Sequence, residues 1–250
     1  MSKIDLATIS TRAPQDLSKE NIKAQTKDLT KELDELQNKL YAESRWSLLV
    51  ILQGMDASGK DGAVKQVFSS VNPQGIRVKS FKAPTKKELA HDFLWRVHQH
   101  TPAQGKIQIF NRSHYEDVLV TRVLGLTNDD TAQKRFQIIN EFEGLLQERG
   151  TQILKFYLHL SETEQQERFR DRLNNPRKHW KFNPNDLKSA TDWPLYRKYY
   201  QEVFERCSPE IPWTVLPSDQ NWYKEYLMAK KIVETLRGLG MKYPGLNHGS

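Results

Sequence analysis

Cysteine is almost absent from this sequence. Cys207 is the only one among 250 residues, and a single thiol cannot form an internal disulfide, so a disulfide-stabilised fold is excluded. We therefore expect a reducing, cytoplasmic location. No local motif surrounds Cys207, which favours a structural role for this residue.

Long apolar runs are absent as well. No segment approaches the ~18 consecutive apolar residues that a membrane-spanning helix needs. The N-terminal stretch MSKIDLATISTRAPQ lacks the apolar core of a signal peptide. We therefore expect no membrane partner.

Acidic residues are outnumbered by basic ones, 31 against 38, and the net charge is +7. This excess favours a polyanionic partner, and nucleic acid, nucleotides and inorganic polyphosphate all fit it. A solvated basic surface without a partner is the alternative that charge alone does not exclude. The length allows one large α/β domain, with or without an added lid.

A glycine-containing loop is the most informative segment. Residues 46–52 have the pattern of a buried strand, and residues 63–68 that of the start of a helix. Strand, glycine loop, lysine and helix are the layout of a P-loop, whose backbone N–H groups and lysine hold phosphate oxygens. The phosphate-binding residues that this layout predicts are Gly54, Ala57, Ser58, Gly59, Lys60, Asp61 and Gly62.

One position departs from the usual P-loop pattern. Asp61 stands where a serine or threonine normally supplies a hydroxyl to magnesium. Asp56, inside the loop, is the obvious substitute, because Mg²⁺ prefers oxygen ligands. The sequence therefore predicts that Asp56 binds the metal.

The chain alternates between strand and helix patterns. Strands are expected at residues 46–52, 76–81, 107–110, 153–160 and 213–216. Helices are expected at 60–70, at 86–99, from 113, and at 131–149, 162–173, 192–206 and 220–237. Strands separated by helices predict a parallel sheet covered on both faces, a three-layer α/β/α fold, with the ligand at the carboxyl ends of the strands.

The N-terminal part divides into an irregular and a helical segment. Residues 1–16 are expected to be flexible, and residues 17–250 to form a single domain. A long helix is predicted from Ser18 to about Tyr41, since leucines recur there at helical spacing. The stripe, which we expect to pack on the domain or on another subunit, consists of Leu29, Leu33, Leu36 and Leu40.

A second acidic segment follows the predicted strand at 107–110. Ser113 and Glu116 have the spacing of a capping box, so Asp117 falls in a first helical turn. There it is expected to face the loop and share the metal with Asp56. Phosphate contacts are predicted for Arg112, in the loop after the strand, and for Arg122, ten residues further on.

A basic segment suggests a mobile lid at about residues 161–190. Ser161 and Glu164 have capping-box spacing, and basic residues crowd the helix and the stretch behind it. A lid of this kind brings arginines onto the transferring phosphoryl group and excludes water. Arg172 and Arg177 are the candidates within it, and the phosphate-binding set is completed by Lys65 and Lys82.

These residues suffice for phosphoryl transfer, which needs positioning and charge neutralisation more than covalent chemistry. The predicted catalytic residues are Asp56, Lys60, Arg112 and Asp117. Mg²⁺ would be held by Asp56 and Asp117. A phosphate acceptor is already ionised at neutral pH, so no strong general base is required.

Four segments together resemble the family 2 polyphosphate kinases. They are Gly54-Met-Asp-Ala-Ser-Gly-Lys-Asp-Gly62, Asn72-Pro-Gln-Gly75, Phe110-Asn-Arg-Ser-His-Tyr-Glu-Asp-Val118 and Trp180-Lys-Phe182. The resemblance spans nearly the whole chain, from about residue 17 to 245. It implies a thymidylate-kinase-like fold with a lid, Mg²⁺ or Mn²⁺ as cofactor, and a homodimer or homotetramer. It also gives the positions of Asp56, Lys60, Arg112 and Asp117 as the functional core.

The activity that the resemblance implies is transfer of the terminal phosphate of inorganic polyphosphate to a nucleotide, and the reverse. A nucleoside diphosphate such as ADP or GDP is the expected acceptor, with a monophosphate as a further one. Two alternatives remain. An ATP-dependent nucleotide kinase on the same fold would need no long basic channel, and a nonenzymatic polyanion binder would show salt-dependent affinity without metal-dependent turnover. No nucleic-acid-binding module is recognisable.

Overall fold

A five-stranded parallel sheet forms the centre of the protein, in a computed structural model that describes residues 4–181, 192–207 and 210–245. The strand order is β2-β3-β1-β4-β5, so the fold class predicted from the sequence is confirmed. Every residue of β1 and β3 is buried, as expected for strands covered on both faces. The strands are β1 (Ser47–Gln53), β2 (Ile76–Ser80), β3 (Ile107–Asn111), β4 (Thr151–His159) and β5 (Trp213–Pro217).

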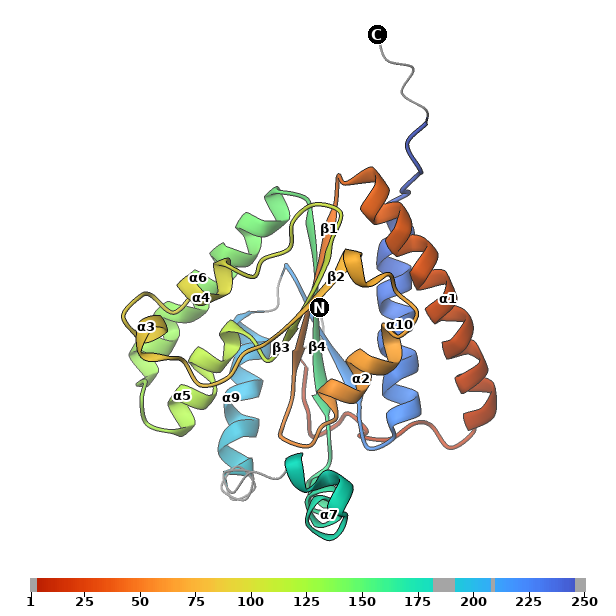
Figure 1. The fold of residues 1–250 in the computed structure, drawn as a ribbon. Helices are drawn as coiled ribbons and strands as arrows, with labels where there is room; N and C mark the ends of the chain where they lie inside the picture. Colours follow the sequence, from red (N-terminus) through yellow and green to blue (C-terminus); the bar gives the residue numbers. More distant parts are fainter. Residues whose placement is uncertain (1–3, 182–191, 208–209, 246–250) are drawn as a thin grey trace.

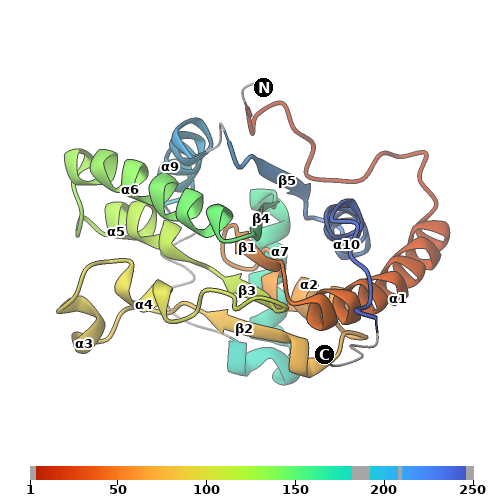
Figure 2. The same cartoon turned by 90° about the horizontal axis from the view of Figure 1, so that it is seen from above.

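Helices cover both faces of this sheet (Figures 1 and 2). Helices α1, α2 and α10 lie on one face, and α5, α6 and α9 on the other. The bounds of the α-helices are α1 Lys19–Glu43, α2 Lys60–Val67, α3 Lys86–Leu89, α4 Trp95–His98, α5 Val120–Val123, α6 Asp129–Glu148, α7 Glu162–Asn174, α9 Trp193–Arg206 and α10 Asn221–Gly238. None of the helices in the described ranges is long and apolar enough to cross a membrane.

The first helix begins and packs as predicted. The Ser18 side chain accepts a hydrogen bond from the Asn21 N–H and caps α1. Leu33 and Leu40 of the stripe are fully buried in the apolar cluster that α1 shares with α2, α10 and the sheet. The stripe therefore faces the domain itself, against α10 (Figure 1).

Two predicted helices are shorter than expected. The single helix predicted at 86–99 is two short helices, α3 and α4, because the Asp92 carboxylate accepts a hydrogen bond from the Leu94 N–H and turns the chain between them. The helix predicted from Ser113 begins as a 3₁₀-helix, η2 (His114–Val118), before α5. The other 3₁₀-helices are η1 (Pro73–Gly75) and η3 (Pro176–Lys181).

The N-terminal segment is irregular, as predicted, but it does not extend freely from the domain. Leu6 is 4% exposed and belongs to the core. The Thr11 hydroxyl donates to Asp219 Oδ2 over 2.8 Å, and the Ala13 N–H donates to Gln220 Oε1 over 2.9 Å. The described part of the segment, from residue 4, is therefore fixed to the loop after β5.

A buried ion pair joins β4 to α6. Lys155 Nζ lies 2.7 Å from Glu143 Oε2, and both side chains are 1% exposed. Lys155 also donates to the Tyr115 hydroxyl and to the carbonyl oxygen of Cys207. Cys207 is itself buried, and burial raises the pKa of its thiol to about 12. The interpretation of Cys207 as a structural residue agrees with this environment.

Removing the lysine should therefore destabilise the fold. We expect Lys155→Met to lower the free energy of unfolding by about 3–5 kcal/mol, because it leaves the Glu143 carboxylate buried without its cation. Urea unfolding followed by circular dichroism measures the change. The control is Lys134→Met, an exposed lysine of α6, which should change the free energy by less than about 0.5 kcal/mol. A loss below about 1 kcal/mol for Lys155→Met would contradict the interpretation.

Candidate active site

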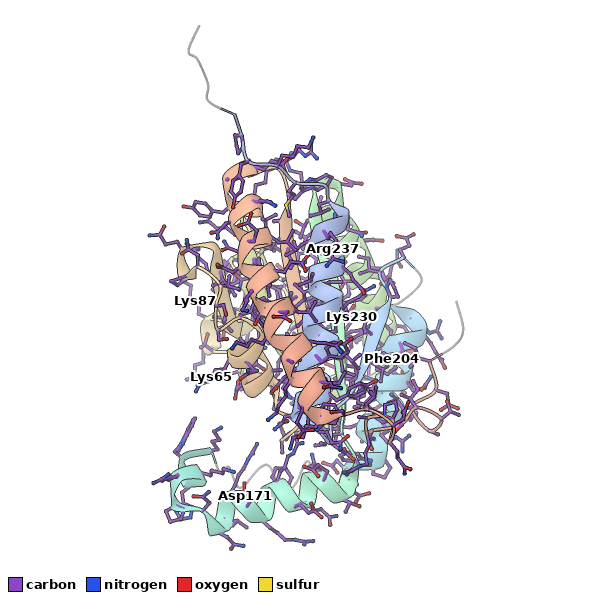
Figure 3. All side chains as sticks on the ribbon, turned by 90° about the vertical axis from the view of Figure 1, so that its right-hand side faces the viewer. Lys65, Lys87, Asp171, Phe204, Lys230 and Arg237 are labelled. Atoms are coloured by element: carbon purple, nitrogen blue, oxygen red, sulfur yellow. The ribbon has the colours of Figure 1, made fainter. Side chains whose placement is uncertain are left out.

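A cavity of about 620 Å³ lies at the carboxyl ends of the strands, between the 54–59 loop and α7. Figure 3 shows α7, with Asp171 labelled, as a separate arm beyond this end of the sheet. Charged side chains from several elements meet in the cavity. The cations that line it are Lys60, Lys82, Arg112, Arg168, Arg172, Lys178 and Lys181, and the acids are Asp56, Asp61, Glu164, Asp171 and Asp219.

Strand β1 leads into the loop through a glycine that nothing larger can replace. A Cβ atom on Gly54 would lie 2.8 Å from the Leu158 carbonyl oxygen of β4, and its φ is +148°. The Gly54 N–H donates to the hydroxyl of Tyr200 on α9 over 3.2 Å. The start of the loop is therefore fixed between two strands and a helix, with the rest of the loop lining the cavity.

Lys60, the first residue of α2, folds back over the loop. Its Nζ donates to the carbonyl oxygens of Gly54 (2.8 Å) and Met55 (3.2 Å) and to Ser58 Oγ (3.3 Å). Burial lowers the pKa of this ammonium to about 8, and the positive charge of Arg112 adds to the shift. A bound phosphate would supply the negative charge that this buried ammonium lacks.

Arg112 follows β3 in a left-handed backbone conformation, with φ +60°. Such a backbone conformation is unusual for any residue other than glycine, and it recurs at functional sites. The Arg112 N–H donates to the Leu52 carbonyl oxygen, and the guanidinium contacts both Asp56 and Glu116. Arg112 and Asp56 thus lie together in the cavity, as the sequence predicts.

The capping box predicted for Ser113 and Glu116 is only half correct. Ser113 Oγ accepts from the Tyr115 N–H and caps η2. The Glu116 carboxylate instead accepts a hydrogen bond from Arg112 Nη1 over 3.2 Å, because a nearby guanidinium binds a carboxylate more strongly than a backbone N–H does. Glu116 therefore orients Arg112.

Asp117 does not reach the cavity where Asp56 lies. Its carboxylate is buried beside Arg96, with Oδ2 3.6 Å from Arg96 Nη2, and Asp117 is not among the residues that line the cavity. Burial raises the pKa of this carboxyl group, and its Oδ2 accepts no hydrogen bond from the described residues. Within the described ranges, no three histidine, cysteine or acidic side chains group into a metal site.

Asp61, at the anomalous position of the loop, lies in the cavity at the start of α2. Its Oδ1 accepts a hydrogen bond from the side-chain amide of Asn111, the last residue of β3. This contact joins the loop helix to the neighbouring strand. Asp61 is thus a lining residue held by the sheet, and its predicted contact with phosphate stays a prediction.

The basic residues predicted to bind phosphate divide into two groups. Lys82 and Arg172 line the cavity, whereas Lys65 and Arg177 are exposed and lie outside its lining. The prediction that Arg122 contacts phosphate is not supported by its position. Its guanidinium pairs with Asp129 (2.6 Å) and Glu202 (2.7 Å) and packs on the Tyr199 ring, so it joins α6 to α9, and it does not line the cavity.

Arg168 lines the cavity although it was not predicted to bind phosphate, as do Lys178 and Lys181. Nη1 donates to the Ala57 carbonyl oxygen, and Nη2 donates to the carbonyl oxygens of Ser218 and Asp219. Its Nε donates to Glu164, one helical turn earlier. The i, i+4 spacing of Glu164 and Arg168 after the Ser161 cap was the only signal in the sequence. The same spacing is common in ion pairs on helix surfaces, so it does not indicate that Arg168 lines a cavity.

The predicted lid is therefore anchored at its beginning. Ser161 caps α7, Phe169 is buried, and the Gln165 amide donates to the Asp56 carbonyl oxygen over 2.8 Å. Any closure would involve the part beyond this anchor, which carries Arg172, Lys178 and Lys181. Residues 182–190 of the predicted lid lie outside the described residues.

Comparison with known proteins agrees with this arrangement. A family model described as polyphosphate kinase 2 matches residues 16–242. A protein of Meiothermus ruber named AMP/ADP-polyphosphate phosphotransferase is 51% identical over 217 residues, which are 86% of this chain and 81% of that protein. An ADP-polyphosphate phosphotransferase of Rhodopseudomonas palustris is 39% identical and covers 97% and 89% of the two chains.

A solved structure gives the same result at the level of the fold. The crystal structure of polyphosphate kinase 2 from Arthrobacter aurescens superposes with a TM-score of 0.96 at 38% identity, covering 100% of this chain and 91% of that one. The similarity therefore extends over the whole chain and is not limited to the sheet.

The lowered pKa of Lys60 predicts how anion binding depends on pH. In the free protein the ammonium is present below pH ~8 and lost above it, whereas a bound anion would raise the pKa and retain the proton. Affinity for tripolyphosphate should therefore fall as the pH rises from about 7 to 9.5. We expect the fall to be about tenfold larger for the wild type than for Lys60→Met.

Isothermal titration calorimetry in EDTA, at matched ionic strength, measures this affinity without metal. The ionisation of tripolyphosphate itself is common to both proteins and cancels in the comparison. Equal losses of affinity in the two proteins would show that Lys60 does not titrate against the bound anion.

Proposed function

Because this chain belongs to the polyphosphate kinase 2 family, we propose that it transfers the terminal phosphate of inorganic polyphosphate to a nucleoside diphosphate, ADP or GDP, and catalyses the reverse reaction. A nucleoside monophosphate is proposed as a further acceptor, since the Meiothermus ruber relative carries both AMP and ADP in its name. The relatives' names favour polyphosphate as donor over the ATP-dependent kinase that the sequence left as an alternative.

The observation that carries the proposal is the distribution of cations around the cavity. Lys60 and the loop lie on one wall, and Lys82 follows β2 on another. Arg172, Lys178 and Lys181 come from the arm formed by α7 and η3. Cations on several walls suit a polyanion that passes through the cavity, whereas a single bound phosphate needs only the loop.

Within this cavity the residues have separable tasks. Lys60 and the loop N–H groups would hold the phosphoryl group that is transferred, and Arg112 would neutralise charge on its oxygens. The arm would position the donor chain and exclude water. No side chain has to act as nucleophile, because the acceptor is a phosphate oxygen that is already ionised.

Carboxylates in a polyanion site argue for a metal ion and against simple polyanion binding. Asp56 lies in the cavity within the loop and contacts the Arg112 guanidinium, and its carboxylate offers oxygen ligands to a metal ion beside the phosphate. Mg²⁺ binds one or two carboxylates together with substrate phosphates, so Asp56 fits as its ligand. When bound, the ion would neutralise charge that develops on the transferred group.

Asp117 is proposed as the second ligand on weaker grounds. Its Oδ2 has no hydrogen-bond donor among the described residues, which leaves a lone pair for a cation. However, Arg96 lies beside it, and the cavity does not include it. Mn²⁺ would replace Mg²⁺ at the same oxygen ligands.

Two properties implied by the family resemblance accompany this proposal. We propose a homodimer or homotetramer, whose mass light scattering would measure. We also propose a cytoplasmic location, which suits a chain whose one cysteine is a buried free thiol.

Transfer from polyphosphate is tested directly. Purified protein is mixed with long-chain polyphosphate and Mg²⁺ and, in separate tubes, with ADP, GDP or AMP, and new nucleotides are followed by chromatography. We expect triphosphate from ADP or GDP. Lys60→Ala should reduce the rate by roughly 10³-fold or more, since it removes the loop cation, and Lys134→Ala on the surface of α6 should leave it unchanged. Absence of transfer to every acceptor would favour an ATP-using kinase.

Removal of the metal tests the role of Asp56. Excess EDTA should abolish turnover, and Mg²⁺ should restore it. Asp56→Asn should raise the Mg²⁺ concentration for half-maximal rate by about tenfold or more, because it removes a charged ligand. Asp130→Asn, at an exposed position of α6, is the control. A magnesium titration of Asp117→Asn that coincides with the wild type would exclude Asp117 as a ligand.

A further inference from the structure

The carbonyl oxygens of the 54–58 loop are all occupied by donors from its own chain. Lys60 takes those of Gly54 and Met55. Gln165 and Arg168 of α7 take those of Asp56 and Ala57. The last carbonyl oxygen, that of Ser58, accepts from Nζ of Lys224 over 2.8 Å.

Lys224 approaches the loop from α10, which packs against α2 and the β4 and β5 strands. Its side chain is fully buried, and Nζ also donates to Asn221 Oδ1 over 2.9 Å. A Cβ atom on Gly59 would lie only 2.4 Å from this Nζ. The ammonium is therefore packed directly against the Ser58–Gly59 peptide, and glycine at position 59 makes room for it.

The hydrogen bond from Lys224 to the Ser58 carbonyl oxygen also fixes the direction of the Gly59 N–H. No peptide bond in the described ranges is cis, so the carbonyl of Ser58 and the N–H of Gly59 point in opposite directions. The Ser58 carbonyl points to Lys224, and the Gly59 N–H therefore points away from it. Gly59 lines the cavity, where an N–H at the start of α2 can meet a phosphate oxygen.

We infer that Lys224 is a positioning residue of the phosphate site: it holds the Ser58–Gly59 peptide so that the Gly59 N–H faces the bound phosphate. This inference rests on the proposed function. Lys224 does not line the cavity itself and acts through the loop. No pattern around position 224 in the sequence signals this role, since Lys224 is one of several lysines along a C-terminal helix.

The charge of Lys224 supports the same role. Burial, together with the positive charges of Arg168 and Lys60, lowers the pKa of this ammonium to about 7, against the opposing effect of Glu225 and Glu164. An ammonium in such surroundings is costly in the free protein. An anion on the far side of the loop offsets that cost, so phosphate binding and the protonated lysine stabilise each other.

The test compares three variants with the wild type. Lys224→Met removes the donor and the charge at nearly constant volume, and Lys224→Gln keeps an N–H donor without the charge. Lys231→Met is the matched control, because Lys231 is an exposed lysine of the same helix. The probe is tripolyphosphate in EDTA, titrated by calorimetry, which reports the affinity of each site and the number of sites separately.

Loss of positioning and loss of folding give different results in this experiment. A misfolded fraction lowers the number of sites, whereas a misplaced N–H lowers the affinity of every site. We expect Lys224→Met to bind tripolyphosphate about tenfold or more weakly at unchanged stoichiometry. Its kcat with polyphosphate and ADP should fall at least as much, while Lys231→Met stays within about twofold of the wild type on both measures.

Affinity and kcat of Lys224→Met within about twofold of Lys231→Met would overturn the inference. So would a fall in stoichiometry with unchanged affinity. If Lys224→Met does not fold, Lys224→Leu, which also lacks the donor and the charge, decides by the same criteria, and Lys224→Gln, which keeps a donor, should bind tripolyphosphate more tightly than either. The binding measurement needs no turnover. A wild type that binds tripolyphosphate but transfers no phosphate would therefore refute the proposed function, and the binding data would still test the role of Lys224.

Discussion

The conformation of the 54–59 loop depends on hydrogen-bond donors that approach it from behind. A phosphate site built from backbone N–H groups requires the carbonyl groups of the same peptides to point elsewhere, and each of those carbonyls needs a partner once it is buried. Here α7 and α10 supply the partners through Gln165, Arg168 and Lys224. The loop therefore depends on residues more than a hundred positions further along the chain.

The same requirement determines how α7 is attached. Asp219, after β5, accepts from the Ser161 N–H at the start of α7 and from the Thr11 hydroxyl of the N-terminal segment. Arg168 donates to the carbonyl oxygen of Asp219 and also to that of Ala57. The first turns of α7 thus belong to the support of the loop, because the same contacts that hold α7 also hold the loop carbonyl groups.

Structural features that depend on interactions within a few residues could be predicted from the sequence. The strands, the Ser161 cap and the leucine stripe of α1 follow from periodicity and side-chain hydrogen bonds within a few residues, and all are confirmed. The glycine loop, Lys60 and Arg112 were predictable for the same reason, because a loop that follows a parallel strand lies at the ligand-binding edge. The sequence was less informative where a side chain can replace a helical hydrogen bond. The Asp92 carboxylate accepts from the Leu94 N–H and so divides the helix predicted at 86–99.

Long-range charge pairing explains the remaining differences. Arg122 was predicted to contact phosphate, but its guanidinium pairs with Asp129 and Glu202. The pairing with Glu202 depends on how α9 packs beside Arg122, and no sequence spacing encodes that packing. Lys224 is the opposite case. Burying its ammonium is costly, and an anion bound across the loop would offset part of that cost. Among the described residues no carboxylate forms an ion pair with Lys224, so its burial behind the loop supports the proposed phosphate site more strongly than an exposed basic run does.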